Sequence, residues 1–541
     1  MSCKYLKKED IDLSDIDLTS DFPLITPSMG AGKTYAVING YIKEAFERKS
    51  GRKINFQLLV TPTKSLRNDV LEQYGEGAVT PLCEADFLCP NDGDTRVRVA
   101  CISQIGKFLQ NGNVIEFAPD LIVFDELDEI AQWTLCHADK LPVFDWVFSN
   151  RDKMLACGIT ATPQLLTDYV NGSADVRFVD TTPDFPINHT CDEIKIYEHM
   201  MIDTLLKSIK PKEDSKVLVY TRSAKKCFQL SRAFPDSGFL ISTYNDELDK
   251  NTGKQLNELM AEQAFQLPNG FGSMSLLDYL NHYQVLPQGV NILFINDAYS
   301  AGINIRDGAI KTVVVESVDV ATIKQVRGRV RHNISSLLIA YNYKEKKNFL
   351  RNLERAERFF SGETNLEEWH LAEQTIIREC EANNERIPID ILTYRSCDGE
   401  AKVNPFAFGF YHYQIGIYSK LADKIGRSTY FHSLLPYSKD RRVSFASDQE
   451  KDAIRADGAN KLSFRNFDLT PYIGRKLFTE DKEHLALDLG LVDTQRHPRR
   501  WTTVKRFLEG EGFTVESKGS KAINPHTGKR QTYSIIRDPK K

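Results

Sequence analysis

The sequence lacks the features of several protein classes. No run of about 18 apolar residues occurs, so a membrane-spanning helix is not expected. The start of the chain has no apolar core of a signal peptide, which predicts an intracellular protein, cytoplasmic or nucleoid-associated. The ten cysteines form no CxxC pair, so a structural zinc site is not expected. Internal repeats and low-complexity tracts are also missing.

The composition is that of an ordinary globular protein. Of 541 residues, 41% are hydrophobic and 27% are charged, and at about 100 to 200 residues per domain this length predicts three or four domains. The net charge is −4, but residues 495–541 hold twelve Lys or Arg and four Asp or Glu. This tail therefore carries +8 and the other 494 residues carry −12.

Short apolar runs alternate with helical patterns from about residue 22 to residue 345. This alternation predicts βαβ units and parallel sheets covered on both faces. A polar stretch near 181–198 separates two such sets, so we expect two tandem α/β domains followed by a mixed α/β C-terminal region. The expected boundaries are 1–190; 191–345, with a helical insertion near 246–289; 346–490, an accessory region that is helical at its start; and 491–541, a basic element.

A glycine-rich segment lies between a predicted strand and a predicted helix. In this segment Gly30, Ala31 and Gly32 precede Lys33 and Thr34. Backbone N–H groups and a helix N-terminus bind phosphate, Lys33 would reach the β and γ phosphates, and Thr34 would hold Mg²⁺. The segment predicts an ATP site, and the alternative is a glycine turn with a surface lysine.

Two carboxylates follow the buried strand 121–124. Asp125 is placed to hold Mg²⁺, and Glu126 to orient and deprotonate the attacking water. An acidic transition from strand to loop is the alternative. Downstream, the hydroxyls of Thr160 and Thr162 could relay hydrogen bonds to a neighbouring surface, although such a string is more often a turn before proline.

The segment 325–332 holds three arginines within five residues. We expect these arginines not to form a buried face. One interpretation is a solvated basic helix end. The other is an arginine finger, in which a guanidinium from the second domain stabilises the γ-phosphate during transfer.

The order of these segments resembles that of superfamily 2 helicases and translocases. Seven matches cover about residues 22–335: PSMGAGKT is similar to motif I, TPTKSL (61–66) to motif Ia, DELD (125–128) to motif II, TAT (160–162) to motif III, VYTRS (219–223) to motif IV, NDAYSAGINIRD (296–307) to motif V and QVRGRVRH (325–332) to motif VI. The resemblance implies two RecA-like domains that hydrolyse Mg·ATP between them.

The resemblance also implies roles for individual residues. Asp128, with Thr160 and Thr162, would couple the nucleotide site to the rest of the protein, and Gly302 would contribute to the nucleotide site. Gln325 and Arg329 would act from motif VI, completed by either Arg331 or His332, because the last arginine of the family pattern falls on His332. The residues implied at a nucleic-acid backbone are Thr61, Thr63, Lys64, Thr221 and Arg222.

Two departures narrow the resemblance. No Q-motif precedes residue 27 and the box reads DELD, which disfavours the DEAD-box RNA helicases. The forms MGxGKT and GRVR are similar to the helicase part of herpesvirus-type origin-of-replication-binding proteins and their relatives in phages and mobile elements. This narrower likeness implies a role in replication initiation.

The basic tail has a pattern of its own. Apolar residues at helix spacing around Trp501 are followed by two alternating segments that flank a basic turn, the outline of a winged helix. Trp501 and Phe507 are expected in its core. The residues expected at DNA are Lys505, Arg506, Lys529 and Arg530. A basic tail with a small α/β cap is the alternative.

Together these features predict an ATP-dependent DNA helicase or translocase with ATP and Mg²⁺ as cofactors. DNA is favoured over RNA as the partner, no membrane partner is expected, and replication or repair proteins would bind through the C-terminal region. The alternatives are a DExH-type RNA helicase and a nucleotide-gated binding protein that uses ATP as a switch.

Overall fold

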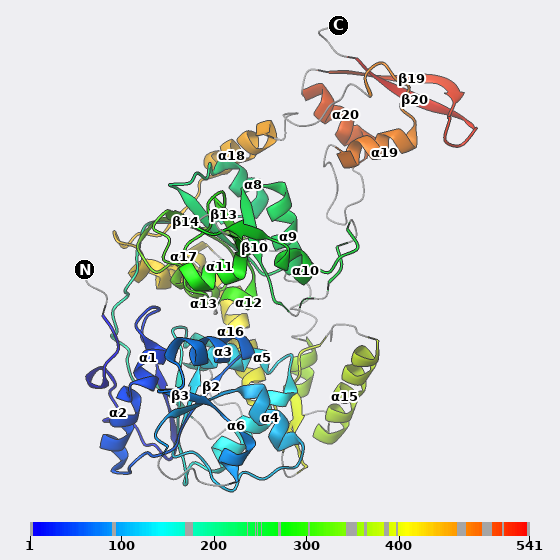
Figure 1. Ribbon diagram of the computed structural model, residues 1–541. Helices are drawn as coiled ribbons and strands as arrows, with labels where there is room; N and C mark the ends of the chain where they lie inside the picture. Colours follow the sequence, from blue (N-terminus) through cyan, green and yellow to red (C-terminus); the bar gives the residue numbers. More distant parts are fainter. Residues whose placement is uncertain are drawn as a thin grey trace. The chain divides into compact units, whose positions relative to one another are not determined.

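The computed structural model describes most of the chain (Figure 1). The described residues are 4–88, 94–167, 177–234, 236–243, 245, 247–249, 252–268, 272–300, 303–341, 354–361, 365–383, 389–396, 399–422, 424–461, 472–488, 500–510 and 513–537. They form two compact units, one of residues 1–203 and 210–447 and one of residues 204–209 and 448–541.

The first sheet of the larger unit has seven strands in the order β3-β4-β2-β5-β6-β1-β7, and every pair is parallel. The strands are β1 (Asp21–Ile25), β2 (Gln57–Thr61), β3 (Val79–Pro81), β4 (Val97–Cys101), β5 (Leu121–Asp125), β6 (Leu155–Ile159) and β7 (Arg177–Asp180). The connecting helices are α1 (Lys33–Ile38), α2 (Tyr41–Ser50), α3 (Lys64–Tyr74), α4 (Ile102–Gln110), α5 (Leu127–Trp133), α6 (Leu141–Ser149) and α7 (Gln164–Thr167), with 3-10 turns at Lys8–Asp10, Glu84–Phe87 and Ala138–Lys140. The inner strands are buried along their whole length, as parallel strands between two helix layers must be.

The second sheet also has seven strands, in the order β10-β13-β9-β14-β15-β8-β18, and every pair is parallel. The strands are β8 (Cys191–Glu198), β9 (Lys216–Thr221), β10 (Ser237–Leu240), β13 (Ile292–Ile295), β14 (Ile310–Glu316), β15 (Ile334–Tyr341) and β18 (Ser444–Phe445). Its helices are α8 (Ile202–Ser208), α9 (Ala224–Ala233), α10 (Leu256–Ala261), α11 (Leu276–Tyr283), α12 (Asp297–Ser300) and α13 (Val320–Arg329). The predicted fold class, two tandem parallel-sheet domains, is confirmed.

The insertion expected to be helical also contains a β-hairpin. Between α10 and α11, strands β11 (Ala264–Gln266) and β12 (Ser273–Ser275) pair antiparallel. The helices α10 and α11 pack against each other and frame this hairpin.

The chain between the second domain and residue 447 belongs to the larger unit. It contains α15 (Leu366–Ala382), β16 (Thr393–Arg395), β17 (Ala401–Val403), α16 (Pro405–Ala422), α17 (Lys424–Phe431) and a 3-10 helix (His432–Tyr437). Ala407 and Tyr411 of α16 share a core with Leu135, which follows α5 of the first domain. β18 pairs with β8 of the second sheet, so this segment contacts both domains.

The smaller unit contains α18 (Asp448–Lys461), α19 (Thr479–Asp488), α20 (Trp501–Gly510), β19 (Thr514–Ile523) and β20 (Arg530–Arg537). The two strands form an antiparallel hairpin. Leu485 of α19 shares one core with Val504, Leu508 and Ile536, and Trp501 packs against that core. The boundary expected at residue 491 therefore falls inside one folded unit.

Among the described residues, no helix combines the length and the apolar character that crossing a bilayer would require.

Candidate active site

The candidate residues of the first domain come from three neighbouring strands. In the order β5-β6-β1 the strands run parallel, so their carboxyl ends share one edge of the sheet. Asp125 ends β5, Thr160 follows β6, and the glycine loop follows β1. Ligands bind at this edge of open α/β sheets, so three segments far apart in the sequence meet at one place.

The glycine loop needs its glycines for two reasons. Gly30 has φ of 78° and Gly32 has φ of 74°, a left-handed conformation that disfavours side chains. A Cβ on Gly30 would also lie 3.0 Å from His189 Nε2 and 3.1 Å from Arg331 Nη1. Gly32 caps α1, which opens with Lys33, so the loop presents a helix N-terminus as an anion site requires.

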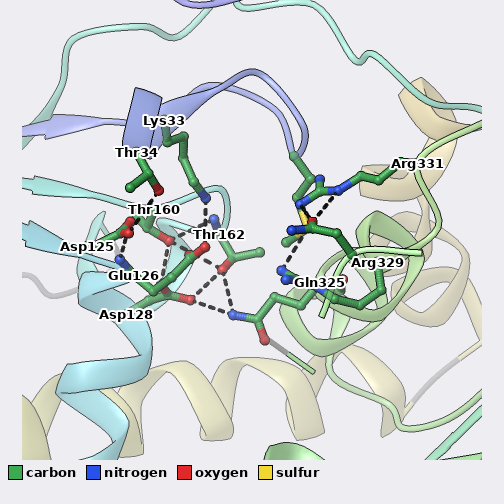
Figure 2. A network of polar contacts seen from close by, with 12 residues as sticks. Lys33, Thr34, Asp125, Glu126, Asp128, Thr160, Thr162, Gln325, Arg329 and Arg331 are labelled. Carbon is green, nitrogen blue, oxygen red and sulfur yellow. Dashed lines mark hydrogen bonds and ion pairs between the residues drawn. The ribbon is translucent and has the colours of Figure 1, made fainter. Parts of the chain in front are cut away.

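Two cross-strand contacts join the glycine loop to the acidic segment. Lys33 Nζ donates to Glu126 Oε1 at 3.0 Å, and Thr34 Oγ1 donates to Asp125 Oδ2 at 3.2 Å (Figure 2). The structure therefore brings together the four residues that the sequence assigned to phosphate, metal and water.

Asp125 and Glu126 differ in electrostatic environment. Burial, together with the charge of Glu126, raises the pKa of Asp125 to about 6. Burial also acts to raise the pKa of Glu126, but the positive charges of Lys33, Arg329 and Arg331 outweigh it and lower the pKa of Glu126 below its usual value. Glu126 is thus held as a carboxylate, the form that accepts a proton from water.

Asp128 is the centre of a buried hydrogen-bond network. It accepts hydrogen bonds from the hydroxyls of Thr160 and Thr162, and Gln325 Nε2 donates to Asp128 Oδ2 at 3.1 Å and to Thr162 Oγ1 at 3.3 Å (Figure 2). Burial and the charge of Glu126 raise the pKa of Asp128 to about 6. The network links motifs II and III of the first domain directly to motif VI of the second.

The expectation that the arginine run is not buried is wrong. Arg327 is 1% exposed and Arg329 is 5% exposed. Arg327 donates to the carbonyl oxygens of Val330, Thr190 and His332 at 2.9, 2.7 and 2.8 Å, and these bonds compensate the burial of its charge. Arg327 therefore joins backbone segments of its own domain.

Arg329 points from the end of α13 towards the first domain (Figure 2). Its Nη2 lies 3.8 Å from Met29 Sδ. Burial lowers the pKa of Arg329, and the negative charges of Glu126, Glu129 and Asp125 oppose this fall. A Cβ on the neighbouring Gly328 would lie 2.0 Å from Met29 Sδ. Motif VI thus packs directly on the glycine loop, and only glycine fits at 328.

Arg331 and His332 occupy different surroundings. The Arg331 guanidinium lies beside Gly30 of the glycine loop, and its Nε donates to Asn304 Oδ1 at 2.7 Å. Its Nη1 is buried with no hydrogen-bond partner among the described residues. His332 Nε2 instead lies 3.0 Å from the Ile310 carbonyl oxygen within the second domain.

The residues assigned to a nucleic-acid backbone divide by exposure. Lys64 and Arg222 are exposed and Thr63 is half-buried, with its hydroxyl capping α3. Thr61 and Thr221 are fully buried, and their hydroxyls donate to the Thr63 carbonyl at 3.0 Å and to Glu316 at 2.6 Å. The hydroxyls of Thr61 and Thr221 therefore form hydrogen bonds within the protein.

In the smaller unit, Lys529 and Arg530 lie exposed at the hairpin turn, and Lys505 lies on α20, 3.6 Å from Glu509. Gly302 and the side chains of Arg506 and Phe507 lie outside the described residues.

Three residues that lie at the site were not assigned a role from the sequence. Met29 packs under Gly328, Asn304 holds Arg331, and His189, from the segment between the domains, lies against Gly30. Burial and the charges of Arg327 and Arg331 lower the pKa of His189 to about 4, so its ring is neutral. The contacts of Met29 and His189 join different domains or the segment between them, whereas Asn304 and Arg331 both belong to the second domain.

The oxygens present fit Mg²⁺. No group of three or more His, Cys, Asp or Glu suited to a metal occurs among the described residues, so an all-protein cage is not found there. Mg²⁺ usually takes one or two protein oxygens and completes its shell with phosphate and water. Thr34 and Asp125, 3.2 Å apart, supply such oxygens.

No protein-family model matches the chain, and no curated protein matches it in sequence. Similar solved structures include Mss116p bound to ssRNA and AMP-PNP, with 14% identity, a TM-score of 0.37, and 63% of this chain and 69% of that chain covered. Another is S. cerevisiae Dbp5 bound to RNA and ADP BeF3, with 11% identity, a TM-score of 0.36, and 62% and 82% covered. Likeness at this level carries no argument about function.

Proposed function

We propose that this protein is an ATP-dependent nucleic-acid motor of the superfamily 2 type, a helicase or translocase. The observation that carries the proposal is the junction of two half-sites. Lys33 and Glu126 pair within one parallel-sheet domain. From the other domain, the charge of Arg329 acts on Glu126, and Gln325 donates a hydrogen bond to Asp128. A site split between two domains lets nucleotide binding and hydrolysis change the relation between those domains.

Each protein group has a task in hydrolysis. Lys33, now paired with Glu126, would turn to the β and γ phosphates and leave Glu126 free to take a proton from the attacking water. Arg329 would stabilise the negative charge that develops on the γ-phosphate. We assign the second guanidinium of motif VI to Arg331, because it lies at the glycine loop whereas His332 is bound to Ile310.

Thr34 and Asp125 would hold Mg²⁺ together with the phosphates of ATP. When bound, the ion neutralises phosphate charge. The hydrogen bond between the two residues holds both oxygens at the carboxyl edge of the sheet.

DNA is the proposed partner, and replication of a virus, phage or mobile element is the proposed setting. Exposed Lys64 and Arg222 would contact the nucleic-acid backbone, which carries no sequence information. The helix, helix and hairpin order of the smaller unit supports its assignment as a winged helix. Its exposed Lys529 and Arg530 would contact duplex phosphates.

The test is ATP hydrolysis measured with single-stranded DNA, duplex DNA, RNA and no nucleic acid, with Lys33→Ala as the inactive control. Stimulation by DNA and strand displacement that requires ATP are expected. Stimulation by RNA alone would replace DNA with RNA as the substrate. If no nucleic acid changes the rate of hydrolysis, the proposed motor function is wrong. ATP binding without turnover would instead indicate a nucleotide-gated switch.

A further inference from the structure

The chain after the second domain connects the far ends of the two helices that carry the candidate active site. Glu126 and Asp128 stand at the N-terminus of α5, which ends at Trp133, and Gln325 and Arg329 stand near the C-terminus of α13. The other end of α5 is bound by Ile391 and Asn404, and the other end of α13 by Tyr413 and Tyr430. Figure 1 shows α16 between the two domains.

At α5 the contact is made by Asn404, the residue before α16. Asn404 is fully buried, and its Nδ2 lies 3.3 Å from Thr134 Oγ1 and donates to the Ile391 carbonyl at 2.9 Å. Its Oδ1 accepts from the Phe406 N–H at 3.0 Å. Ile391 N in turn donates to the Leu135 carbonyl at 2.8 Å. The start of α16 is thus fixed to the end of α5.

At α13 the contact is made by two tyrosines. Asp319 caps α13, accepting from Ala321 N at 3.1 Å, and the Tyr413 hydroxyl of α16 donates to the same Asp319 oxygen. The Tyr430 hydroxyl of α17 accepts from Val320 N at 3.1 Å and donates to the Val318 carbonyl at 3.1 Å. Both tyrosines therefore hold the N-terminus of α13.

These contacts close a ring. Asn404 and Tyr413 are about 14 Å apart along α16 at 1.5 Å per residue, so the helix spans from one domain to the other. A helix transmits displacement along its axis because its backbone hydrogen bonds resist stretching. The ring runs from α5 through Asn404, α16, Tyr413 and α13 back to α5 through Gln325 and Asp128.

We infer that Tyr413 and Tyr430 are positioning residues for the proposed hydrolysis reaction, acting through α13 on Arg329 and Gln325. This inference rests on the proposed function. The two tyrosines set how far α13 lies from the acidic end of α5. Their loss should lower the rate of the chemical step and leave ATP binding by the glycine loop intact, because Lys33 and Thr34 have no part in the ring.

The experiment compares Tyr413→Phe with Tyr411→Phe, a matched loss of one hydroxyl from the same helix whose bond goes to Asp390. In steady-state ATP hydrolysis with saturating nucleic acid, Tyr413→Phe should lower kcat about threefold to tenfold, the rate equivalent of one hydrogen bond, with KM for ATP unchanged. Tyr411→Phe should leave kcat within about twofold. An unchanged kcat in Tyr413→Phe, or an equal fall in both variants, overturns the inference.

A double variant separates positioning from general damage to the fold. In a background that carries both Arg329→Ala and Gln325→Ala, Tyr413→Phe should cause little further loss of rate, because both residues through which it acts are gone. A full additional loss would mean that Tyr413 only stabilises the protein and would overturn the inference. If Tyr413→Phe does not fold, Tyr430→Phe takes its place, with the same expected loss of kcat and the same outcomes against it.

Failure of the proposed function is a distinct result. If the wild-type protein hydrolyses no ATP under any condition, the proposed function is wrong. If Arg329→Ala abolishes a measurable wild-type rate while Tyr413→Phe and Tyr430→Phe leave it unchanged, the motor stands and the positioning role of the tyrosines is wrong.

Discussion

At the scale of single residues, charge and burial decide which carboxyl group does what. Four acidic side chains occur within five positions, Asp125, Glu126, Asp128 and Glu129, yet only Glu126 has its pKa lowered. Lys33 and the two arginines of motif VI surround it, whereas its neighbours are buried beside its negative charge. Glu126 is therefore suited to accept a proton, whereas Asp125, Asp128 and Glu129 hold their protons more tightly than ordinary carboxyl groups.

We predict that Lys33→Ala abolishes ATP hydrolysis and leaves the fold intact, because the proposed role of Lys33 is to bind phosphate and its side chain is not part of the hydrophobic core. Glu126→Gln should bind ATP and fail to hydrolyse it, since the amide keeps the shape and loses the basic group. Nucleotide binding by fluorescence and turnover by phosphate release separate the two variants. Near wild-type turnover in Glu126→Gln would show that Glu126 is not the base.

Glu129 gives a prediction about pH and stability. Burial and the charges of Glu126 and Asp128 raise its pKa to about 8, and its Oε2 has no hydrogen-bond partner among the described residues. The folded protein therefore holds a proton that the unfolded chain releases, and between the ordinary carboxyl pKa and pH 8 stability falls as pH rises. Glu129→Gln should remove this loss of stability at higher pH, because glutamine does not ionise.

The melting temperature of Glu129→Gln relative to wild type should therefore rise from pH 5 to pH 8. Glu368→Gln, an exposed carboxylate on α15, serves as the control and should show no such trend. Identical trends for the two variants would contradict the assigned environment of Glu129.

At the scale of elements, α13 carries two arginines, two residues apart, whose side chains contact different domains. Arg327 binds carbonyl oxygens of its own domain and Arg329 faces the carboxylates of the other. Gly328 between them lets the helix approach Met29 closely. Through Arg327 this short helix binds its own domain, and through Arg329 it contributes a positive charge to the candidate site.

We predict that Arg329→Ala slows ATP hydrolysis by about 10³-fold with little change in ATP affinity, the usual scale for an arginine finger. Arg331→Ala should share this defect and His332→Ala should not, because only Arg331 lies at the glycine loop. Single-turnover hydrolysis measures all three. If all three substitutions slow hydrolysis equally and only slightly, the basic segment 325–332 contributes only to the fold.

Arg327→Ala should instead lower the free energy of unfolding by about 3 kcal/mol, because several buried carbonyl groups lose their donor. Urea denaturation of the variant beside Arg329→Ala checks this assignment. A larger loss of stability in Arg329→Ala than in Arg327→Ala would reverse the two roles.

At the scale of the whole molecule, the basic charge gathers in the smaller unit, which carries the proposed duplex contacts. Removing residues 495–541 would break a shared core, because Leu477 and Leu485 pack with Val504 and Leu508. Substitution of exposed basic residues is the sharper test. We predict that Lys521, Lys529 and Arg530 changed together to Gln leave basal ATP hydrolysis unchanged and weaken duplex binding.

The slope of log K against log salt should fall by about 0.9 for each lost phosphate contact, roughly 3 for the triple variant. Arg52 and Lys53, changed to Gln, form the control, because they precede β2 and lie at the amino ends of the strands, opposite the edge where ligands bind. Equal slopes for both variants and wild type would remove the hairpin from the DNA interface.

Local sequence patterns were enough to predict the two parallel sheets and the residues at the carboxyl ends of their strands. Apolar runs with β-branched residues specify buried parallel strands, and each motif sits where one strand ends, so the positions of Lys33, Asp125, Glu126 and Thr160 follow from local order. These features depend on residues only a few positions apart, so they can be predicted from the sequence.

Contacts between distant segments could not be predicted from local patterns and are known only from the folded chain. Contacts between residues more than ninety positions apart bury Arg327, place Arg331 beside Gly30 and form the ring from Asn404 to Tyr413. Arginine is predicted to be exposed because its charge is costly to bury, and it is buried here because distant carbonyl and carboxylate oxygens compensate that cost. Such compensation exists only after the chain has folded.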